Sequence, residues 1–536
     1  MVPMKPQVFF DPRSRTLIYD LDDPDRLLPH VQGGVRLSNG YLAAPAELYN
    51  LQVLAMAGLP VPGPLTIDGY DWPIRAPWRP RDHQRVMSNF MALHPRAFNL
   101  SDMGTQKTLA ALWAADYVMT KNPGWKTLIV CPVSIMQRVW GDAITNHFIG
   151  RRTYRILYGN ADRRRKLLAE QADFYIVNFD GVGVGAKVNL RGKVELGGLS
   201  HELAARQDIG ISIIDEGRAY STGNTRRYRV AWSVLVPKPY IWLLTGTPTP
   251  TGPLDAHGLC RIINPSYPES FTAYKQRVMY HVGLWKWLPR PGAHKEAYKL
   301  LQPAIRFEMR ECTDVPPCTE QMRDVELSQE QKEHYKKLQR DCVLTIENKQ
   351  ITAVHEAALR LKLIQLSCGC VYDSNHNMIR VDCSPRLTEL CDVIEEAARK
   401  VIVFAPLTSV LHMLHEHLTK QGYTVELING EVPIRQRDAI FKRFQDCEDP
   451  KIIVADPGTM SHGLDLYAAS VVVWYGATDR TELYLQANRR IDRPGQTVPT
   501  TIVQLAATAI EREIYRRVAA NQSMQGLILG LARGLD

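Results

Sequence analysis

The chain has 536 residues, of which 45% are hydrophobic and 23% charged, and this length allows about two to four globular domains with sizeable cores. No stretch reaches the roughly twenty apolar residues of a membrane-spanning helix, and the N-terminus lacks an apolar signal segment. We therefore expect no membrane partner and a cytoplasmic location, or a nuclear one in a eukaryote. A net charge of +9, from 65 basic and 56 acidic residues, fits a polyanionic partner.

The first part of the chain predicts two structural units. Residues 1–68 hold a short hairpin-like pattern and the start of a Pro/Gly-rich connector, which indicates a small N-terminal domain. Residues 69–275 alternate apolar runs with helical stretches, which predicts a parallel sheet covered on both faces. The runs are TLIVCP at 127–132, YRILYG at 154–159, FYIVNF at 174–179, ISIIDE at 211–216 and IWLLTGT at 241–247.

The second part of the chain repeats that rhythm after an interruption. Residues 276–385 are charged and predicted to be mostly helical, as an insertion or linker. Residues 386–536 return to alternating strands and helices, which predicts a second parallel sheet. Its apolar runs are VIVFA at 401–405, TVELING at 424–430, KIIVAD at 451–456, SVVVWYG at 470–476 and TIVQLA at 501–506. The fold class is therefore α/β, with two parallel-sheet lobes.

A phosphate-binding loop is predicted at Ser101-Asp-Met-Gly-Thr-Gln-Lys-Thr108, which follows an apolar run and opens a helical one. In such a loop backbone N–H groups hold the phosphates, Lys107 reaches the β and γ oxygens, and Thr108 is a ligand of Mg²⁺. Gln106 departs from the glycine that usually precedes the lysine. The alternative is an ordinary strand-to-helix turn. The loop residues expected to contact nucleotide are Asp102, Met103, Gly104, Thr105, Gln106, Lys107 and Thr108.

Two adjacent carboxylates end a buried apolar run at Asp215 and Glu216. Uncompensated carboxylates there would be costly, which favours a bound cation. Asp215 is predicted to hold Mg²⁺ and Glu216 to polarise an attacking water. The alternative is that the pair caps the next helix.

A third element, Gln486-Ala-Asn-Arg489-Arg490-Ile-Asp-Arg493-Pro-Gly-Gln496, lies in the second lobe. Arg490 and Arg493 are three residues apart, so on a helical turn they would share a face and could stabilise γ-phosphate charge. A solvated basic helix is the alternative.

These pieces, in this order, resemble the Swi/Snf-type translocases of helicase superfamily two over roughly residues 75 to 520. RPRDHQ, ending at Gln84, resembles that family's adenine-reading glutamine motif. IIDEGR resembles its DEGH-type Walker B element. LLTGTPTP, with Thr245, Gly246 and Thr247, resembles the motif that couples nucleotide state to DNA. GTMSHGLDLYAASVVVW, with Gly463 and Asp465, resembles the fifth motif, and QANRRIDRPGQT, with Gln486, the sixth.

The resemblance implies two RecA-like lobes and an ATP-dependent, Mg²⁺-requiring DNA translocase or helicase that acts on duplex, forked or branched DNA. Fork remodelling, annealing or branch migration in replication, recombination or repair is the expected role, with a monomeric motor and a bacterial or phage source. Arg218 and Asp492 stand where many relatives carry histidine. The alternatives are a DNA-binding scaffold whose loop Gln106 has weakened, an RNA-unwinding enzyme, and the motor subunit of a restriction system.

Other clusters leave two interpretations open. Arg163 to Lys166, with Arg151, Arg152 and Arg155, could grip phosphates or form a solvated face. Trp285 and Trp287 could stack on bases or anchor packing. The ten cysteines lack a dense framework, which predicts reduced thiols, and the spacing of those between Cys368 and Cys391 does not match paired zinc knuckles.

Overall fold

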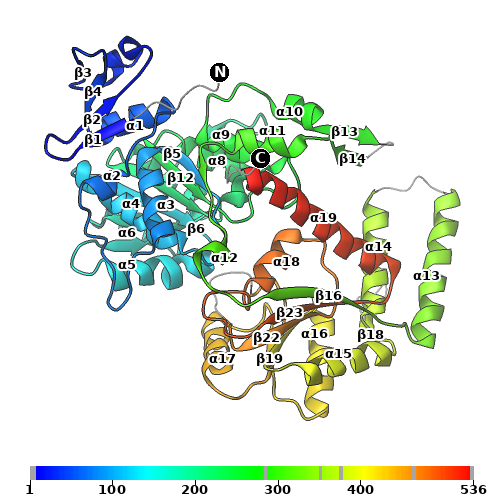
Figure 1. Ribbon diagram of the computed structural model, residues 1–536. Coiled ribbons are helices and arrows are strands. Elements are labelled where there is room, and N and C mark those ends of the chain that lie inside the picture. Colours follow the sequence, from blue (N-terminus) through cyan, green and yellow to red (C-terminus); the bar gives the residue numbers. More distant parts are fainter. Residues whose placement is uncertain (1–7, 283–285, 349–352, 373–377, 461–465, 532–536) are drawn as a thin grey trace. The chain divides into compact units, whose positions relative to one another are not determined.

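The computed structural model describes residues 8–282, 286–348, 353–372, 378–460 and 466–531. The chain divides into two compact units. The first contains Met1–Cys312 and Gln525–Asp536, and the second contains Thr313–Met524. Each unit is built around its own parallel sheet (Figure 1). The predicted α/β class with two parallel-sheet lobes is confirmed.

The first unit begins with an antiparallel four-stranded module. Its strands are β1 (Val8–Asp11), β2 (Thr16–Tyr19), β3 (Val35–Arg36) and β4 (Leu42–Pro45), in the order β1-β2-β4-β3. Helix α1 (Leu48–Met56) packs its Leu51 and Leu54 into a separate small core with Leu17 and Leu42. Gln52 of α1 donates to the Ala92 carbonyl and to the Tyr240 hydroxyl, so the module is tied to the body of this unit.

The first parallel sheet has seven strands in the order β15-β5-β12-β11-β6-β8-β7. All of its pairings are parallel. The strands are β5 (Arg96–Asn99), β6 (Lys126–Cys131), β7 (Tyr154–Ile156), β8 (Phe174–Asn178), β11 (Ile209–Asp215), β12 (Tyr240–Leu244) and β15 (Ala304–Ile305). Every residue of β11 and β12 is buried, as expected where helices cover both faces of a sheet.

Helices flank this sheet (Figure 1). They are α2 (Pro64–Ile67), α3 (Asp82–Leu93), α4 (Lys107–Lys121), α5 (Asp142–His147), α6 (Ala161–Ala169), α7 (Gly198–Ala205), α8 (Arg226–Leu235), α9 (Asp255–Ile263), α10 (Phe271–Val278), α11 (Ala293–Leu300) and α12 (Met309–Cys312). Two short hairpins accompany them, β9 (Lys187–Val188) with β10 (Val194–Glu195), and β13 (Met279–Val282) with β14 (Lys286–Pro289).

Helix α4 is the centre of the first core. Its residues Leu109 to Met119 are all buried, because small alanines on several sides let the helix pack tightly between α3 and the sheet. The one buried acid there, Asp116, accepts hydrogen bonds from Tyr70 Oη (2.6 Å), Arg151 Nε (2.8 Å) and Arg152 Nε (2.6 Å). These arginines therefore serve the packing of α4.

The second unit has a six-stranded parallel sheet in the order β16-β23-β22-β19-β21-β20. Its strands are β16 (Cys318–Asp324), β19 (Lys400–Phe404), β20 (Val425–Ile428), β21 (Ile452–Ala455), β22 (Ala469–Trp474) and β23 (Thr500–Ala506). Its helices are α13 (Gln329–Asn348), α14 (Ala353–Ser367), α15 (Ser384–Glu396), α16 (Thr408–Lys420), α17 (Ile434–Asp446), α18 (Thr481–Asn488) and α19 (Ala509–Leu531). An antiparallel hairpin joins β17 (Cys370–Tyr372) to β18 (Met378–Arg380).

The segment 276–385 contains the predicted helices α13 and α14 but also supplies a strand to each sheet. Strand β15 pairs with β5 in the first sheet, and β16 pairs with β23 in the second. Both are edge strands, with only one neighbour each. The sequence CTEQMRD of β16 is polar and mostly exposed, so no apolar run marks it.

A buried ion pair crosses the core of the second unit. Arg386 Nη2 of α15 lies 2.7 Å from Glu511 Oε1 of α19, and both side chains are almost wholly buried. Arg386 also donates to the carbonyls of Tyr475 and Leu505. The nearby Cys368, Cys370 and Cys383 are buried free thiols, and the described residues hold no group of three metal-ligating side chains.

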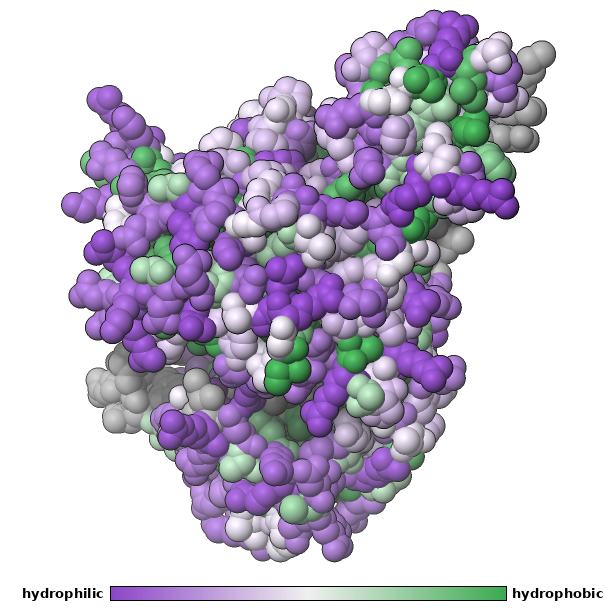
Figure 2. All heavy atoms as spheres, turned by 90° about the vertical axis from the view of Figure 1, so that its left-hand side faces the viewer, coloured by the Kyte–Doolittle hydropathy of each residue, from purple (hydrophilic) through white to green (hydrophobic). Residues whose placement is uncertain are grey.

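The face of the molecule in Figure 2 is mostly hydrophilic, with hydrophobic residues scattered over it. Among the described residues, no helix combines the length and apolar character needed to cross a membrane.

Candidate functional site

Three loops meet at the carboxyl edge of the first sheet. The loop after β5 carries Ser101 to Gln106, the one after β11 carries Glu216, and the one after β12 carries Thr245 to Thr247. Strand order places β5, β12 and β11 side by side, and their chains all run the same way. Segments far apart in sequence therefore end at one crevice, where ligands bind in open parallel sheets.

The phosphate-loop lysine lies inside its own loop. Lys107 Nζ donates to the Ser101 carbonyl (2.7 Å) and to the Asp102 carbonyl (3.0 Å). Burial lowers the pKa of Lys107, and the carboxylates of Glu216, Asp215 and Asp102 oppose that shift. An ammonium held at this point is positioned to exchange loop carbonyls for phosphate oxygens.

Gln106 adopts a left-handed conformation, with φ of 57° and ψ of 43°, immediately before α4. A residue other than glycine in this region costs about 1–3 kcal/mol. Gln84 Nε2 donates to Gln106 Oε1 at 2.8 Å, and the Arg81 amide donates to Gln84 Oε1 at 2.9 Å. The glutamine predicted to read adenine is thus fully buried, and its amide bonds to the phosphate loop itself.

A segment that the sequence analysis missed supports the same loop from the other side. The Asp102 amide donates to the Phe307 carbonyl (2.9 Å), and the Phe307 amide donates to Ser101 Oγ (3.1 Å). Arg306 Nη1 lies 3.1 Å from Asp102 Oδ1. No motif marks these residues, because β15 spans only two positions and their role depends on where that short strand joins β5.

An open pocket of about 650 Å³ lies beside this loop. Its lining includes Arg81, His83 and Phe307, and the rings of His83 and Phe307 are 5.9 Å apart. Burial lowers the pKa of His83, so its imidazole is neutral at pH 7. The pocket offers flat rings beside the phosphate loop, a suitable setting for a nucleobase.

The carboxylate pair lies at the end of β11. Asp215 Oδ2 accepts a hydrogen bond from Trp140 Nε1 at 2.9 Å, and Asp215 Oδ1 accepts one from the Glu216 amide at 3.0 Å. Burial raises the pKa of Asp215, while Lys107 opposes the rise. Glu216 has a φ of 53°, which turns the chain sharply out of the strand. A buried carboxylate that accepts these two hydrogen bonds fits a cation ligand, since Mg²⁺ commonly uses one or two carboxylates plus phosphate oxygens.

The Thr245-Gly-Thr247 turn packs on the phosphate loop. The Thr245 amide donates to the Asn99 carbonyl at 3.1 Å, and the Thr247 amide donates to Thr245 Oγ1 at 3.2 Å. A Cβ at Gly246 would lie 3.3 Å from the Met103 nitrogen, so only glycine fits without displacement. A shift of the phosphate loop would therefore be felt directly by this turn.

The second unit holds the remaining predicted residues. Gln486 is buried on α18, and its carbonyl accepts a hydrogen bond from Arg490 Nε at 3.2 Å. Helix α18 ends at Asn488, so Arg490 and Arg493 lie on the turns that follow it and not on a helical face. Arg490 is buried and Arg493 half-buried, which argues against a fully solvated basic helix. Gly463 and Asp465 lie outside the described residues.

Family models match both halves of the chain. The model for the SNF2-related domain matches residues 99–370, and the model for the helicase conserved C-terminal domain matches residues 385–495. The chain belongs to the SNF2-related family. The matched ranges contain Lys107, Asp215 and Glu216 in the first case, and Arg490 and Arg493 in the second. The predicted resemblance to Swi/Snf-type members of helicase superfamily two is confirmed.

Individual relatives of this SNF2-related chain are distant. The ISWI chromatin-remodeling complex ATPase CHR11 of Arabidopsis thaliana is 22% identical over 84% of this chain and 43% of its own length. Putative protein p41 of Acyrthosiphon pisum secondary endosymbiont phage 1 is 23% identical over 84% of this chain and 98% of its own. A solved Sulfolobus solfataricus SWI2/SNF2 ATPase core in complex with dsDNA is 20% identical over 86% of this chain and 95% of that one, with a TM-score of 0.38.

The chain thus spans less than half of the Arabidopsis remodeller and nearly all of the phage protein. Membership of the SNF2-related family, with the paired C-terminal helicase domain, supports the predicted class of nucleic-acid-dependent ATP hydrolase.

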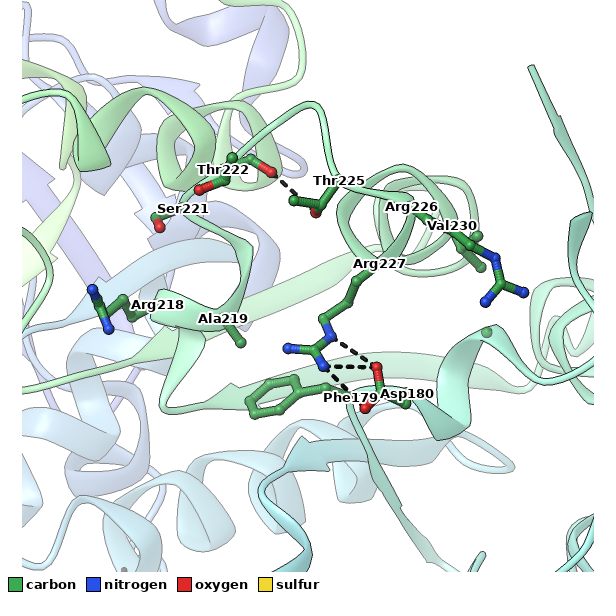
Figure 3. A pocket seen from close by; sticks show the side chains of 11 residues that line it. Phe179, Asp180, Arg218, Ala219, Ser221, Thr222, Thr225, Arg226, Arg227 and Val230 are labelled. Carbon is green, nitrogen blue, oxygen red and sulfur yellow. Dashed lines mark hydrogen bonds and ion pairs between the residues drawn. The ribbon is translucent and has the colours of Figure 1, made fainter. Parts of the chain in front are cut away.

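A second pocket in this SNF2-related unit was not foreseen from sequence. It has a volume of about 520 Å³. It is lined by the loop after β8, by residues that follow Glu216 in the sequence, and by the start of α8 (Figure 3). Arg227 of α8 points to Asp180, and its Nε and Nη2 donate charge-assisted hydrogen bonds to the two carboxylate oxygens, at 2.9 and 3.0 Å. In the sequence, the adjacent arginines at the start of RRYRVAW were the feature that could have indicated this charged pocket.

The basic cluster near residue 163 has mostly internal partners. Arg155 pairs with Glu170 and Arg165 pairs with Glu202. Arg164 is buried, and its Nη1 donates to the Leu157 carbonyl at 2.7 Å. These contacts favour a structural role for the cluster over a phosphate grip. Trp285 lies outside the described residues, and Trp287 lies under the Lys275 ammonium, 4.1 Å from the ring centre.

Proposed function

We propose that this chain is an ATP-dependent translocase that moves on duplex, forked or branched DNA. The observation that best supports this proposal is the convergence of four elements at one edge of the first sheet, in a SNF2-related unit. They are Lys107, Asp215, Glu216 and the Thr245-Gly-Thr247 turn. The mutual electrostatic influence of Lys107 and the two carboxylates supports a single site.

In the proposed nucleotide site, each residue has a separate role in binding ATP. The loop Asp102 to Gln106 holds the phosphates through its amides, and Lys107 contacts the β and γ oxygens. The base lies near His83 and Phe307, with Gln84 fixing the loop behind it. Thr108 and Asp215 would hold Mg²⁺, which neutralises phosphate charge when bound.

Hydrolysis is assigned to side chains of both units. Glu216 accepts a proton from the attacking water, and Arg490 and Arg493 stabilise charge on the γ-phosphate, with Gln486 setting the position of Arg490. The Thr245-Gly-Thr247 turn, packed on Met103, passes changes in the phosphate loop to the DNA-contacting loops. Gly463 and Asp465 complete the nucleotide contacts in this proposal.

The proposed division of labour follows the chain. Residues 1–68 recognise DNA structure, 69–275 form the ATP-binding lobe, 276–385 connect the lobes, and 386–536 form the second motor lobe. Fork remodelling, annealing or branch migration by a monomer in a bacterial, phage-infected or nuclear setting is the proposed role.

The test is steady-state ATP hydrolysis with no nucleic acid, single strands, duplex, forked DNA and RNA. We expect duplex or forked DNA to stimulate turnover, and Glu216→Gln to lower kcat by about 10²–10⁴-fold, because the general base is lost. Glu326→Gln is the matched control, since this carboxylate is 87% exposed in the second unit. Equal rates for wild type and Glu216→Gln would refute the assignment.

A DNA-binding scaffold is the second candidate. It is favoured by the left-handed Gln106 and by a lysine already satisfied by its own loop carbonyls. On that account DNA binds, nucleotide binds weakly, and no nucleic acid stimulates turnover. A motor subunit of a restriction system would hydrolyse ATP on duplex DNA but would need a nuclease partner.

A further inference from the structure

A short β-hairpin in the first unit presents a fully exposed leucine. Strands β9 and β10 pair Val194 with Val188 and Glu195 with Lys187. Leu190 lies at the tip between them and has 108% of its reference exposure, the highest value among the exposed large hydrophobic side chains of the described chain. A single exposed leucine is ordinary on a protein surface, so its position and neighbours carry the inference.

The tip is a fixed turn. The Gly192 amide donates to the Asn189 carbonyl at 2.8 Å, and the Lys193 amide donates to Asn189 Oδ1 at 2.9 Å. Asparagine at the first turn position and a glycine of positive φ at the fourth suit such a turn. Leu190 and Arg191 are therefore held at the two central positions, pointing out of the turn.

The hairpin is also anchored at its base and its side. Arg226 Nη2 of α8 donates to the Ala186 carbonyl at 2.8 Å. The Arg229 guanidinium lies against Gly192 so closely that a Cβ there would be 1.6 Å from Nη1. Gly185 and Gly197 approach each other where the two strands begin and end. The base of the hairpin is therefore tied to α8.

The surroundings of the tip are cationic. The hairpin segment 186–196 and helix α8 together carry six basic residues and one acidic residue. Lys187, Arg191 and Lys193 are exposed on the hairpin. In Figure 3, Arg226 and Arg227 leave α8 in different directions, and Arg227 is paired with Asp180.

An aromatic pocket of about 650 Å³ adjoins the hairpin, with Gly192 and Val194 in its lining. Tyr228 and Trp232 of α8 and Phe271 of α10 supply rings, and Arg229 and Arg261 supply positive charge. Its lining also contains Asp255, and burial raises the pKa of that carboxyl. Flat apolar rings beside guanidinium groups suit a nucleobase and its phosphate, because every base has a π-face and each phosphate is an anion.

We propose that the β9–β10 hairpin is a DNA wedge, in which Leu190 enters the base stack and the adjoining aromatic pocket receives the displaced base. A two-stranded ribbon fits a DNA groove, and apolar side chains such as leucine unstack a base step when basic neighbours hold the phosphates. This inference rests on the proposed DNA translocase function and adds a strand-disturbing element to it.

The test uses the full chain and forked duplexes that carry one 2-aminopurine at successive positions, without ATP. Unstacking raises 2-aminopurine fluorescence. We expect wild type to raise it at one position beside the wedge, and Leu190→Ala and Phe271→Ala to lose the rise. Leu190→Phe should keep it, since phenylalanine is also an effective wedge. Ile149→Ala, at an 81% exposed site elsewhere in the unit, is the matched control.

Salt titration of DNA binding separates the two parts of the surface. Arg191→Ala should reduce the slope of log K against log salt by about 1, and Leu190→Ala should leave that slope unchanged. The wedge is refuted if Leu190→Ala retains the fluorescence rise, or if a photoreactive group at position 190 crosslinks to protein and not to DNA. Failure of the proposed function itself would appear differently, as wild-type ATPase that no DNA stimulates.

Discussion

At the scale of single residues, the nucleotide site combines a familiar pattern with one departure from it. Burial lowers the pKa of Lys107, and the carboxylates of Glu216 and Asp215 oppose that shift. Gln106 takes the backbone conformation that glycine would adopt, and Gln84 compensates with a side-chain hydrogen bond. Strain of about 1–3 kcal/mol is set against a hydrogen bond of about 0.5–1.5 kcal/mol. The Gln106 side chain therefore lies at the position where, in a phosphate loop with glycine, the backbone approaches the phosphate.

Gln106→Gly is therefore expected to tighten nucleotide binding. The glycine accepts the left-handed conformation without strain and opens the loop to phosphate, while the lost hydrogen bond keeps the change in unfolding free energy within about 1 kcal/mol. Titration with a fluorescent ATP analogue and thermal unfolding measure both quantities. Gln106→Ala is the matched control, because it removes the same amide without freeing the backbone. Weaker binding by the glycine variant than by the alanine variant would contradict the explanation.

At the scale of elements, buried carboxylates bind arginines from segments that hydrophobic patterning alone would not place beside them. Asp116 on α4 receives Arg151 and Arg152, and Arg386 on α15 meets Glu511 on α19. Asp116 and Glu511 are fully buried, so removing their arginines leaves a buried carboxylate unpaired. The first pairing holds the loop between α5 and β7 against α4, and the second holds α15 against α19.

Arg386→Met is expected to lower the free energy of unfolding by about 3–5 kcal/mol, because Glu511 and two carbonyls lose their donor. The double variant Arg386→Met with Glu511→Leu should recover part of the loss. Denaturant unfolding measures both. Arg516→Met, which breaks the exposed pair with Glu513, is the control and should cost no more than about 1 kcal/mol. A double variant less stable than the single would be contrary to this account.

At the scale of the whole molecule, each of the two compact units has its own parallel sheet and carries residues of the proposed motor. The first holds the predicted phosphate loop, the two carboxylates and the Thr245-Gly-Thr247 turn, and the second holds Arg490 and Arg493. The net charge of +9 is modest for the chain, because 56 acidic residues offset most of the 65 basic ones. Basic residues near position 163 are paired internally. Lys187, Arg191 and Lys193, by contrast, are exposed to solvent on the β9–β10 hairpin.

DNA affinity should therefore depend on salt through a small number of phosphate contacts. We expect log K to fall linearly with log salt, with a slope that Lys187→Ala and Lys193→Ala each reduce by about 1. Fluorescence anisotropy of a labelled duplex measures the slope. Arg165→Ala is the control, because Arg165 pairs with Glu202. If all three substitutions changed the salt slope equally, Arg165 would contact DNA despite its ion pair with Glu202, contrary to this prediction.

The sequence by itself determined the α/β class, the order of the main strands, and the loops that follow β5, β11 and β12. Apolar runs and turn residues act over a few neighbouring positions, so their pattern is legible without a fold. Strands β15 and β16 were not predicted from the sequence, because β15 is very short and β16 is a polar edge strand. Only the tertiary structure decided that Gln84 bonds to Gln106, that Arg306 and Phe307 support the phosphate loop, and that Arg151 serves Asp116. These partners lie tens to hundreds of residues apart, and a side chain's role depends on which distant segment packs beside it.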